Sequence, residues 1–520
     1  MSVARYDAVV VGGGHNGLVC AAYLARAGRS VLVLEANPHV GGAAVTREFA
    51  PGFRVSAGAH LLHLMPKRLI AELNLSRHGL SMAATHMPTY ALASGVGTVR
   101  VEAAARNASD GLTAADAQAL PEFFGRMHTL AAALWPLLEG IPPRLGAGEW
   151  RDRLTMARLG IKLRLLGRRR LRELLRIAGM CVHDLLEEHF HSPLLKGALA
   201  FDAVLGTNYG PRSPGTVFTL LYRMAAEGAA GQGLAQPAGG LGALSEALES
   251  AASAAGAEIR TATPVQRILV DGERACGVRL ESGEQVEAKC VISGADPRTT
   301  YLKLLGAEQL DAGFVRRITH LRTHGMTAKF HAALERMPTF LGIDGIPRGR
   351  VVLAPSPDAI ERAFNHAKYG EFSASPVLEV VVPTSCDAAL APAGKHVLSA
   401  IVQYAPYQLR EGWDSGRARF TDLILETLER HAPGLRAAVS ATELLTPADI
   451  EAQFRISGGH WHHAELALDQ FFTMRPVIGA AQYRAPVPGL YLCGAGTHPG
   501  GGVLGMGGRN AAQQVLREAR

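Results

Sequence analysis

The first 42 residues change from one hydrophobic periodicity to another. From Asp7 to Gly12 the chain is apolar and β-branched, which predicts a buried strand. From Leu18 to Ala27 the apolar positions follow a helical period that Gly28 ends. A second apolar run, Val31 to Leu34, predicts another strand, and Glu35 follows it directly. The order strand, tight turn, helix, strand and acid predicts a βαβ unit.

Three glycines give the turn of this unit the spacing G-x-G-x-x-G. Gly12 allows the turn, Gly14 lets the backbone approach a pyrophosphate, and Gly17 lets the helix pack closely on the strand. The diphosphate then meets the helix N-terminus, and the Glu35 carboxylate is placed to accept hydrogen bonds from an adenosine ribose. A glycine-rich turn without a ligand is the alternative, which the complete context of the motif disfavours.

A second glycine-rich cradle lies at the far end of the chain. Leu490 to Cys493 predicts a strand, and a glycine-rich loop and a final helix follow it. Near the N-terminus, Gly41, Gly42 and the small residues after them allow another close approach to a diphosphate. Two such sites in one chain suit a long, extended dinucleotide, which favours FAD over NAD.

Residues 236–299 return to the pattern of a nucleotide-binding domain. The predicted strands are Glu258 to Arg260, Val265 to Val270, the hairpin Gly277 to Leu280 and Gln285 to Ala288, and the buried Cys290 to Ser293. Gly294 ends the last of these strands beside the expected nucleotide. This block therefore belongs with the N-terminal domain.

The remaining stretches suggest two further kinds of structure. From about Ile70 to Gly228 the pattern is mostly helical and predicts an inserted helical region without a sheet. From Thr300 to about Phe472 strands and helices mix, which predicts an antiparallel sheet with a few helices under a substrate cavity. The predicted segments are 1–69, 231–299 and 475–520 for the nucleotide domain, 70–230 for the helical insertion, and 300–474 for the rest of an α+β substrate domain.

Length and composition are those of a globular protein of two or three domains, with 520 residues, 48% hydrophobic and 19% charged. The six cysteines form no C-x-x-C pair, so a reducing compartment such as the cytoplasm is expected, without a redox disulfide. No apolar run approaches the ~20 residues of a bilayer span. The βαβ unit begins within seven residues of Met1, which leaves no room for a cleaved signal peptide.

Several motifs resemble those of the phytoene-desaturase-like flavoproteins. They are GGGHNGLVCAAYLARAG, the GGAA turn, QPAGGLGALSEAL with GVRLESGE, and LDQFFTMRP before LYLCGAGTHPGGGVLGMGGRNAA. Within these flavoproteins the chain is most similar to the pyridine nucleotide-disulfide oxidoreductase domain-containing protein 2 group and the desaturase-type β-carotene ketolases. The resemblance implies an α/β fold with a discontinuous, glutathione-reductase-like (Rossmann) FAD-binding domain and a substrate domain over the flavin ring. Disulfide chemistry is not expected, because the redox cysteine pair is absent.

The resemblance also assigns residues to the cofactor. Gly12, Gly14, Gly17 and Glu35 hold the ADP half, Gly42, Ala43 and Arg47 the middle, Val265 the adenine through its backbone, and Gly494, Ala495, Gly502 and Val503 the ribityl and flavin end. Arg47 and Arg475 are either diphosphate or ring contacts, or ion pairs at the domain surface.

Three histidines stand close together as His460, His462 and His463. They suggest a metal site, but such sites usually add a separate Cys, Asp or Glu, and spacing marks none here, so no metal is expected. His463 matches a family position and is the candidate catalytic residue near the flavin, with a structural histidine as the alternative. The same two interpretations apply to His60.

The favoured function is that of an FAD-dependent dehydrogenase, desaturase or ketolase, which passes a hydride from an apolar, isoprenoid or acyl, substrate to flavin N5. No second G-x-G-x-x-G follows a strand, so a nicotinamide domain is not expected and the electrons leave to oxygen or a quinone.

Two alternatives remain open. A flavin amine oxidase is disfavoured, because Ala495 stands where the amine oxidases of this fold usually carry Glu and no aromatic residue lies between Ala495 and Asn510. A non-enzymatic lipid carrier of the GDP-dissociation-inhibitor type would lack flavin.

The net charge of +7 does not indicate a nucleic-acid partner, because it is concentrated in residues 151–176. This segment holds ten Lys or Arg against two acids, and its leucines predict one or two basic amphipathic helices broken near Gly160 or Gly167. Such a helix binds an anionic membrane surface, from which an apolar substrate can be collected. A solvated helix that packs its leucines on the protein is the alternative.

Overall fold

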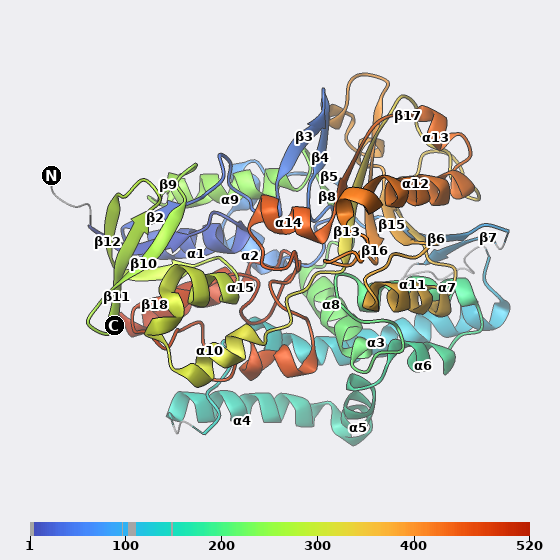
Figure 1. Cartoon of the computed structure of the whole chain (residues 1–520). Coiled ribbons are helices and arrows are strands. Elements are labelled where there is room, and N and C mark those ends of the chain that lie inside the picture. The colour runs from blue at the N-terminus through green and yellow to red at the C-terminus, as the bar shows by residue number, and fades with distance from the viewer. Residues whose placement is uncertain (1–4, 96, 102–110, 147–148, 520) are drawn as a thin grey trace.

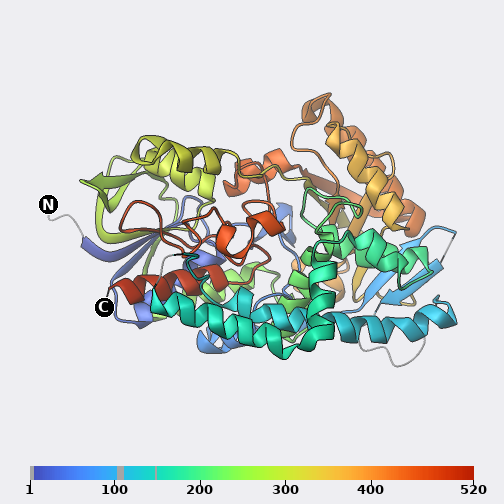
Figure 2. The ribbon, with the colours of Figure 1, turned by 90° about the horizontal axis from the view of Figure 1, so that it is seen from below.

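The computed structural model describes residues 5–95, 97–101, 111–146 and 149–519. Two seven-stranded sheets lie at opposite ends of the molecule within these ranges, with helices around both (Figure 1). Residues 5–11 and 506–518, at the two ends of the described chain, both lie at the first sheet in Figures 1 and 2. In the described residues we find no helix that is long and apolar enough to cross a membrane.

The first sheet has the strand order β10-β11-β12-β1-β2-β9, and β18 pairs with β12. Its strands are β1 (Arg5–Val11), β2 (Val31–Leu34), β9 (Glu258–Arg260), β10 (Val265–Asp271), β11 (Arg274–Leu280), β12 (Gln285–Ser293) and β18 (Leu490–Leu492). The core strands β18, β12, β1, β2 and β9 are parallel. Distant stretches of chain thus share one sheet, and the predicted α/β class with a discontinuous Rossmann-type domain is confirmed.

One correction concerns β12, which the sequence divides into Gln285 to Ala288 and Cys290 to Ser293. The structure has a single nine-residue strand. Its first half pairs antiparallel with β11, and its second half pairs parallel with β18 on the same edge. The exposed Lys289 interrupts the apolar pattern, but β1 pairs along the strand on both sides of this residue.

Helices cover both faces of the first sheet. On one face lie α1 (His15–Arg26), α9 (Gly242–Ala254) and α15 (Met506–Glu518), and α1 packs against both of the others. On the other face lie the helical turn Thr299–Gly306 and α10 (Ala312–Thr319), which share a hydrophobic core with β10, β11 and β12.

The second sheet has the order β17-β13-β16-β15-β14-β6-β7 and is antiparallel except between β14 and β6. Its strands are β6 (Thr89–Ala93), β7 (Gly97–Val101), β13 (Thr327–Leu334), β14 (Arg350–Leu353), β15 (Val377–Val381), β16 (His396–Gln403) and β17 (Val439–Leu445). The surrounding helices are α11 (Pro357–Lys368), α12 (Trp413–His431), α13 (Leu435–Ala438) and α14 (Pro447–Phe454).

The inserted region is helical over most of its length. It contains α2 (Lys67–Glu72), α3 (Ala114–Glu139), α4 (Trp150–Leu165), α5 (Gly167–Ala178), α6 (Val182–Glu187), α7 (Pro193–Val204) and α8 (Thr216–Ala230). The expectation of a region without a sheet is wrong for residues 82–101. There β6 and β7 extend the second sheet, and β5 (Met82–Ala84) pairs with β8 (Gln236–Pro237).

The two sheets are connected through a small hairpin of β3 (Thr46–Ala50) and β4 (Phe53–Ser56). Phe53 and Val55 of β4 share a hydrophobic cluster with Ala333 of β13 and Val397 of β16. The hairpin therefore leaves the nucleotide domain after the Gly41–Gly42 turn and packs against the second sheet.

Candidate active site

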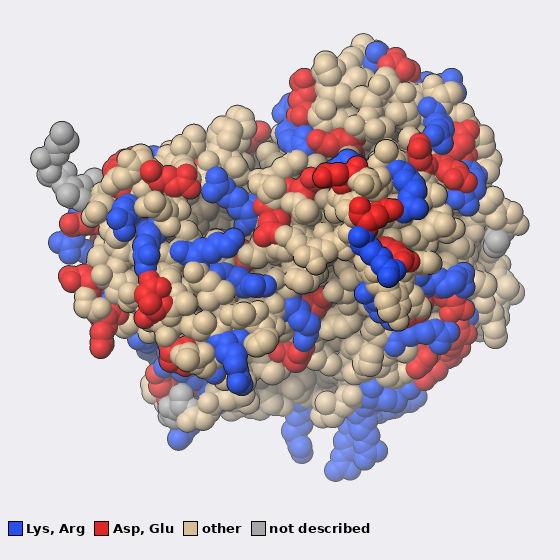
Figure 3. Space-filling view, in the orientation of Figure 1, with Lys and Arg blue, Asp and Glu red and all other residues tan. Residues whose placement is uncertain are grey.

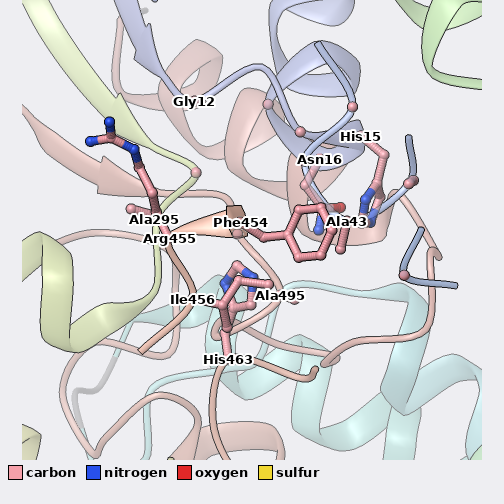
Figure 4. Close-up of a pocket in the computed structure, with 18 of the residues that line it drawn as sticks. Gly12, His15, Asn16, Ala43, Ala295, Phe454, Arg455, Ile456, His463 and Ala495 are labelled. Atoms are coloured by element: carbon pink, nitrogen blue, oxygen red, sulfur yellow. The ribbon is translucent and has the colours of Figure 1, made fainter. Parts of the chain in front are cut away.

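A large cavity lies between the two sheets, where the carboxyl ends of β1, β2, β12 and β18 meet the start of α1 (Figure 4). It encloses about 1520 Å³, counting the part open to solvent. The predicted residues that line it are Gly12, Gly14, Gly17, Glu35, Gly42, Ala43, Val265, Gly294, Gly494, Ala495, Gly502, Val503 and His463. The structure thus brings together residues from four segments, whereas Arg47 and His60 lie outside the lining.

The glycines of the first turn have the geometry of a diphosphate cradle. Gly12 has a φ of +97°, and a Cβ on Gly17 would stand 2.1 Å from the Gly12 carbonyl oxygen, so these two glycines serve the turn and the helix packing. A Cβ on Gly14 would meet no protein atom within 4 Å, because it would point into the cavity. The first turn of α1 therefore presents its amides to a ligand at a helix N-terminus, where anions bind.

The Glu35 carboxylate is buried and held in place by the backbone. Its Oε2 accepts a hydrogen bond from the Gly13 amide at 2.7 Å, and its Oε1 accepts one from Asn37 at 2.8 Å. A carboxylate has about four acceptor positions, so two remain for ligand hydroxyls. This arrangement fits the ribose of an adenine dinucleotide.

At the opposite end of the cavity the backbone is closely packed and strained. Val503 has a φ of +58°, an unusual conformation for a β-branched residue. A Cβ on Gly494 would lie 2.4 Å from the Gly294 carbonyl oxygen, so the two loops touch through their backbones. Strained backbone of this kind clusters at ligand sites. α15 begins at Met506, shortly after Val503.

Arg475 organises the loops at this end and is fully buried. Its guanidinium donates to the carbonyl oxygens of His462 at 2.6 Å, Glu465 at 2.8 Å and Ala495 at 2.9 Å. Burial lowers its pKa to about 10. Arg475 is therefore a structural cation that ties residues 462–470 to the loop after β18, and neither a diphosphate contact nor a surface ion pair.

Histidine rings face the cavity with free nitrogens. Among the described residues, Nε2 of His15, Nδ1 of His462 and Nδ1 of His463 are buried without a hydrogen-bond partner. Burial lowers the pKa of His15 and of His463 to about 4, so both rings are neutral near pH 7. Figure 4 shows the rings of His15 and His463 directed into the cavity. Buried polar atoms in proteins are normally paired, so these nitrogens fit the polar groups of a ligand.

The predictions from sequence do not include His15, although this residue stands inside the first glycine motif. His460 is directed toward Glu465, with its Nε2 3.5 Å from that carboxylate. In the described part of the chain, no group of three or more His, Cys, Asp or Glu side chains is arranged to hold a metal ion.

His60 belongs to a buried polar cluster beside the cavity. Its Nε2 lies 2.8 Å from Glu379 Oε1, and the Lys329 ammonium lies 2.7 Å from its Nδ1. Lys329 therefore donates to a neutral imidazole that donates in turn to Glu379. Burial lowers the pKa of His60 to about 4 and that of Lys329 to about 7.

The cluster continues through Arg350, which bridges two carboxylates. Its guanidinium lies 3.1 Å from Glu379 and 2.6 Å from Asp202. Burial disfavours the Glu379 carboxylate, but Arg350 and His60 outweigh this effect and hold its pKa well below the usual range. The cluster is a buried charge network on β13, β14, β15 and α7.

Arg47 takes part in an ion pair between the domains. Its guanidinium lies 2.8 Å from Glu443 of β17 and 3.3 Å from the Gln453 side chain of α14. Arg47 thus holds the β3–β4 hairpin against the second sheet.

Comparison with known proteins identifies the family of this chain. The profile of the family described as flavin containing amine oxidoreductase matches residues 17–516. The chain belongs to this family. It is a flavin-dependent oxidoreductase with FAD as its cofactor, and the diphosphate cradle and ribose acceptor of the cavity fit this cofactor.

Two of the relatives match nearly the whole chain, and a third matches about two thirds of it. Pyridine nucleotide-disulfide oxidoreductase domain-containing protein 2 of Mus musculus is 37% identical over 99% of this chain and 94% of its own length. A limonene dehydrogenase polypeptide of Castellaniella defragrans is 26% identical over 99% and 95%. Lycopene-forming phytoene desaturase of a Paracoccus species is 28% identical over 64% of each. The resemblance to phytoene-desaturase-like flavoproteins is confirmed.

Solved structures share the fold. A putrescine oxidase triple mutant is 17% identical over 99% of this chain and 98% of its own, with a TM-score of 0.65. At this identity the likeness describes the architecture alone.

Proposed function

We infer that this flavoenzyme is a dehydrogenase or desaturase that removes a hydride from an apolar, isoprenoid or acyl, substrate and passes the electrons to oxygen or a quinone. The observation that carries this proposal is the apolar lining of the cavity outside the cofactor cradle. Ile450, Phe454, Ile456 and Trp461 line it, and they come from residues 450–461 and not from the glycine turns. Such a surface binds hydrocarbon by excluding water.

The charges of the lining also favour an apolar substrate over an amine. Among the described lining residues Glu35 is the one carboxylate, and the Gly13 and Asn37 amides hold it at the nucleotide end. Among the described lining residues, the charged side chain contributed by the substrate-domain segment is the exposed Arg455, which offers an ammonium group no anionic partner. A protonated amine would therefore enter without an anionic partner, which costs free energy.

The chain's own residues bind and orient the substrate and exclude water from it. FAD supplies the hydride acceptor and the route to a second electron acceptor. The N-terminus of α1 would hold the diphosphate, and Arg475 fixes the loop that carries Ala495. His463 is neutral, so it contributes a hydrogen-bonding group without adding charge beside a hydrocarbon.

The names of two relatives agree with this proposal. Limonene and phytoene are both apolar isoprenoids, and the chains named for them resemble this chain over their full or partial length. The family description and the putrescine oxidase fold keep amines among the compounds to be tested.

The test is anaerobic mixing of the purified holoenzyme with isoprenoid hydrocarbons, long-chain acyl thioesters and amines, with bleaching of the flavin absorbance as the measurement. We expect bleaching by an isoprenoid or acyl compound and none by amines. Efficient bleaching by amines alone would contradict the proposal.

A matched pair of variants locates the substrate. Phe454→Asp adds a carboxylate to the apolar lining and should lower the rate of bleaching at least about tenfold, because a buried charge disfavours a hydrocarbon beside it. Ala452→Asp adds the same charge to the exposed face of α14 and should leave the rate unchanged. Equal rates in both variants would show that the substrate binds elsewhere.

A further inference from the structure

The helix α4 lies on the outside of the molecule and presents its apolar side to solvent. None of its sixteen residues is buried. Trp150, Ile161 and Leu165 are 68%, 59% and 79% exposed. Seen from below in Figure 2, α4 lies in front of the protein beside α15. An ordinary surface helix turns its large apolar side chains inward, whereas α4 also leaves several of them exposed.

The exposed apolar residues form one stripe. Trp150, Leu154, Ile161 and Leu165 follow a spacing of four, seven and four residues, which brings them to the same side of a helix of 3.6 residues per turn. The residues turned toward the protein are instead those of intermediate exposure, such as Leu159 and Leu163. Four large apolar side chains are therefore exposed along one line.

Basic residues flank this stripe on both sides. By the same helical geometry, Arg151, Arg158 and Lys162 lie along one edge, and Arg153 and Arg164 lie along the other. α5 adds Arg168, Arg169 and Arg170 at the corner where the chain turns at Gly167, which has a φ of +80°. Lys and Arg side chains project from the lower edge of the molecule in Figure 3, where Figure 1 shows α4 and α5.

Most of these cations have no carboxylate partner among the described residues. All ten Lys and Arg of residues 151–176 are exposed, and within the described part of the chain Arg176 alone pairs with a carboxylate, that of Glu188 at 2.9 Å. Arg151 stacks on the Trp150 ring at 5.5 Å. The charges are therefore available to an external anionic surface.

We propose that the outward face of α4, with the arginines at the start of α5, docks on an anionic phospholipid bilayer. The apolar stripe enters the boundary between headgroups and acyl chains, while the flanking cations bind lipid phosphates. A flat bilayer fits better than a protein partner, because the stripe is straight, lies along the helix axis and has like charges on both edges. α5 anchors this platform to the body through the buried Leu174 and Ile177.

The experiment is sedimentation of the full-length holoenzyme with phosphatidylcholine vesicles and with vesicles of equal parts phosphatidylcholine and phosphatidylglycerol. We expect binding to the anionic vesicles that weakens between about 0.05 M and about 0.5 M salt. Arg168, Arg169 and Arg170→Glu should lower the affinity about tenfold or more. The matched control Arg54, Arg77 and Arg316→Glu makes the same charge change at exposed positions elsewhere and should bind like the wild type.

A second pair of measurements separates insertion from charge alone. Leu154, Ile161 and Leu165→Asn keeps every cation and should weaken binding severalfold at both salt concentrations, because the stripe no longer enters the bilayer. A quencher attached to the lipid acyl chains should reduce the tryptophan fluorescence of the bound protein. The Trp150→Phe variant should lack the quenched component, which would assign it to Trp150. These vesicle measurements need no substrate, so their outcome does not depend on the proposed activity.

Two outcomes would overturn the proposal. One is the absence of salt-sensitive binding in the wild type, or equal losses in the two triple Glu variants. The other is a wild-type dimer, seen by analytical ultracentrifugation, that the Asn variant converts to a monomer while vesicle binding stays the same. In that case the stripe would bind a second copy of the chain.

Discussion

At the scale of single residues, Gly14 and Gly17 separate cofactor binding from folding. Gly14→Val places its side chain in the cavity without meeting protein within 4 Å of the Cβ, so we expect a folded protein that purifies without yellow colour. Gly17→Ala meets the Gly12 carbonyl at 2.1 Å and should cost about 1–3 kcal/mol of stability. Flavin absorbance and thermal unfolding of both variants provide the measurement. Full flavin content in Gly14→Val would contradict the assignment of the turn.

Lys329 should make stability depend on pH. Burial lowers its pKa from 10.5 to about 7, so between these values the unfolded chain binds a proton that the folded chain does not. The free energy of unfolding therefore rises with pH across this window, by up to about 5 kcal/mol. Lys329→Met should remove this part of the slope in urea titrations from pH 7 to 10. Lys303→Met, which changes an exposed lysine, should keep the slope.

The sequence identified the backbone contacts of the site better than its side-chain network. Gly12, Gly14 and Glu35 are found by local spacing, because the turn that binds a dinucleotide is built from consecutive residues. The His60, Lys329 and Glu379 cluster has no local signature, since Lys329 and Glu379 lie 269 and 319 positions after His60 in the chain. Only the packing of the second sheet against the segment after β4 brings them together.

At the scale of elements, the ion pair between Arg47 and Glu443 should join the domains without touching the cofactor. The side chains are 28% and 22% exposed, so the pair is worth about 1 kcal/mol or less. We expect Arg47→Met and Glu443→Gln to lower the unfolding free energy by similar amounts, with little added loss in the double variant. FAD affinity, measured by titration of the apoprotein, should change less than about twofold in either. A loss of FAD affinity in Arg47→Met without a similar loss in Glu443→Gln would instead show that Arg47 binds the cofactor.

The hydrophobic pattern predicts the bounds of a strand correctly where the strand keeps the same neighbours along its whole length. β2 and β9 have the predicted bounds, because each is a short run between clear turns. The sequence predicts two strands in place of β12. The hydrophobic pattern changes midway along it, where its neighbour on one edge changes from β11 to β18. The sequence does not predict β6 and β7, because β14, the strand that joins β6 to the second sheet, lies far along the chain. β7 then pairs with β6 at the edge of that sheet.

At the scale of the whole molecule, both glycine-rich cradles line the same cavity, so they serve one dinucleotide. We therefore expect NADH and NADPH not to bleach the bound flavin at a useful rate under anaerobic conditions, because no second G-x-G-x-x-G turn directly follows a strand in the sequence to hold a nicotinamide nucleotide. Stopped-flow mixing at micromolar nicotinamide provides the measurement. Rapid bleaching would assign the enzyme a reductase activity that the fold does not suggest.

The strand β12 takes its parallel partner β18 from the far end of the chain, and this has a consequence for biosynthesis. Gly494, Gly502 and Val503 follow β18, so the cavity needs this stretch of chain as well as the first glycine turn. Domains generally begin to fold from the N-terminus during synthesis, but here the first turn is a complete binding site only once residues 490–503 have been made. We therefore expect a chain that is truncated before β18 to purify without flavin absorbance.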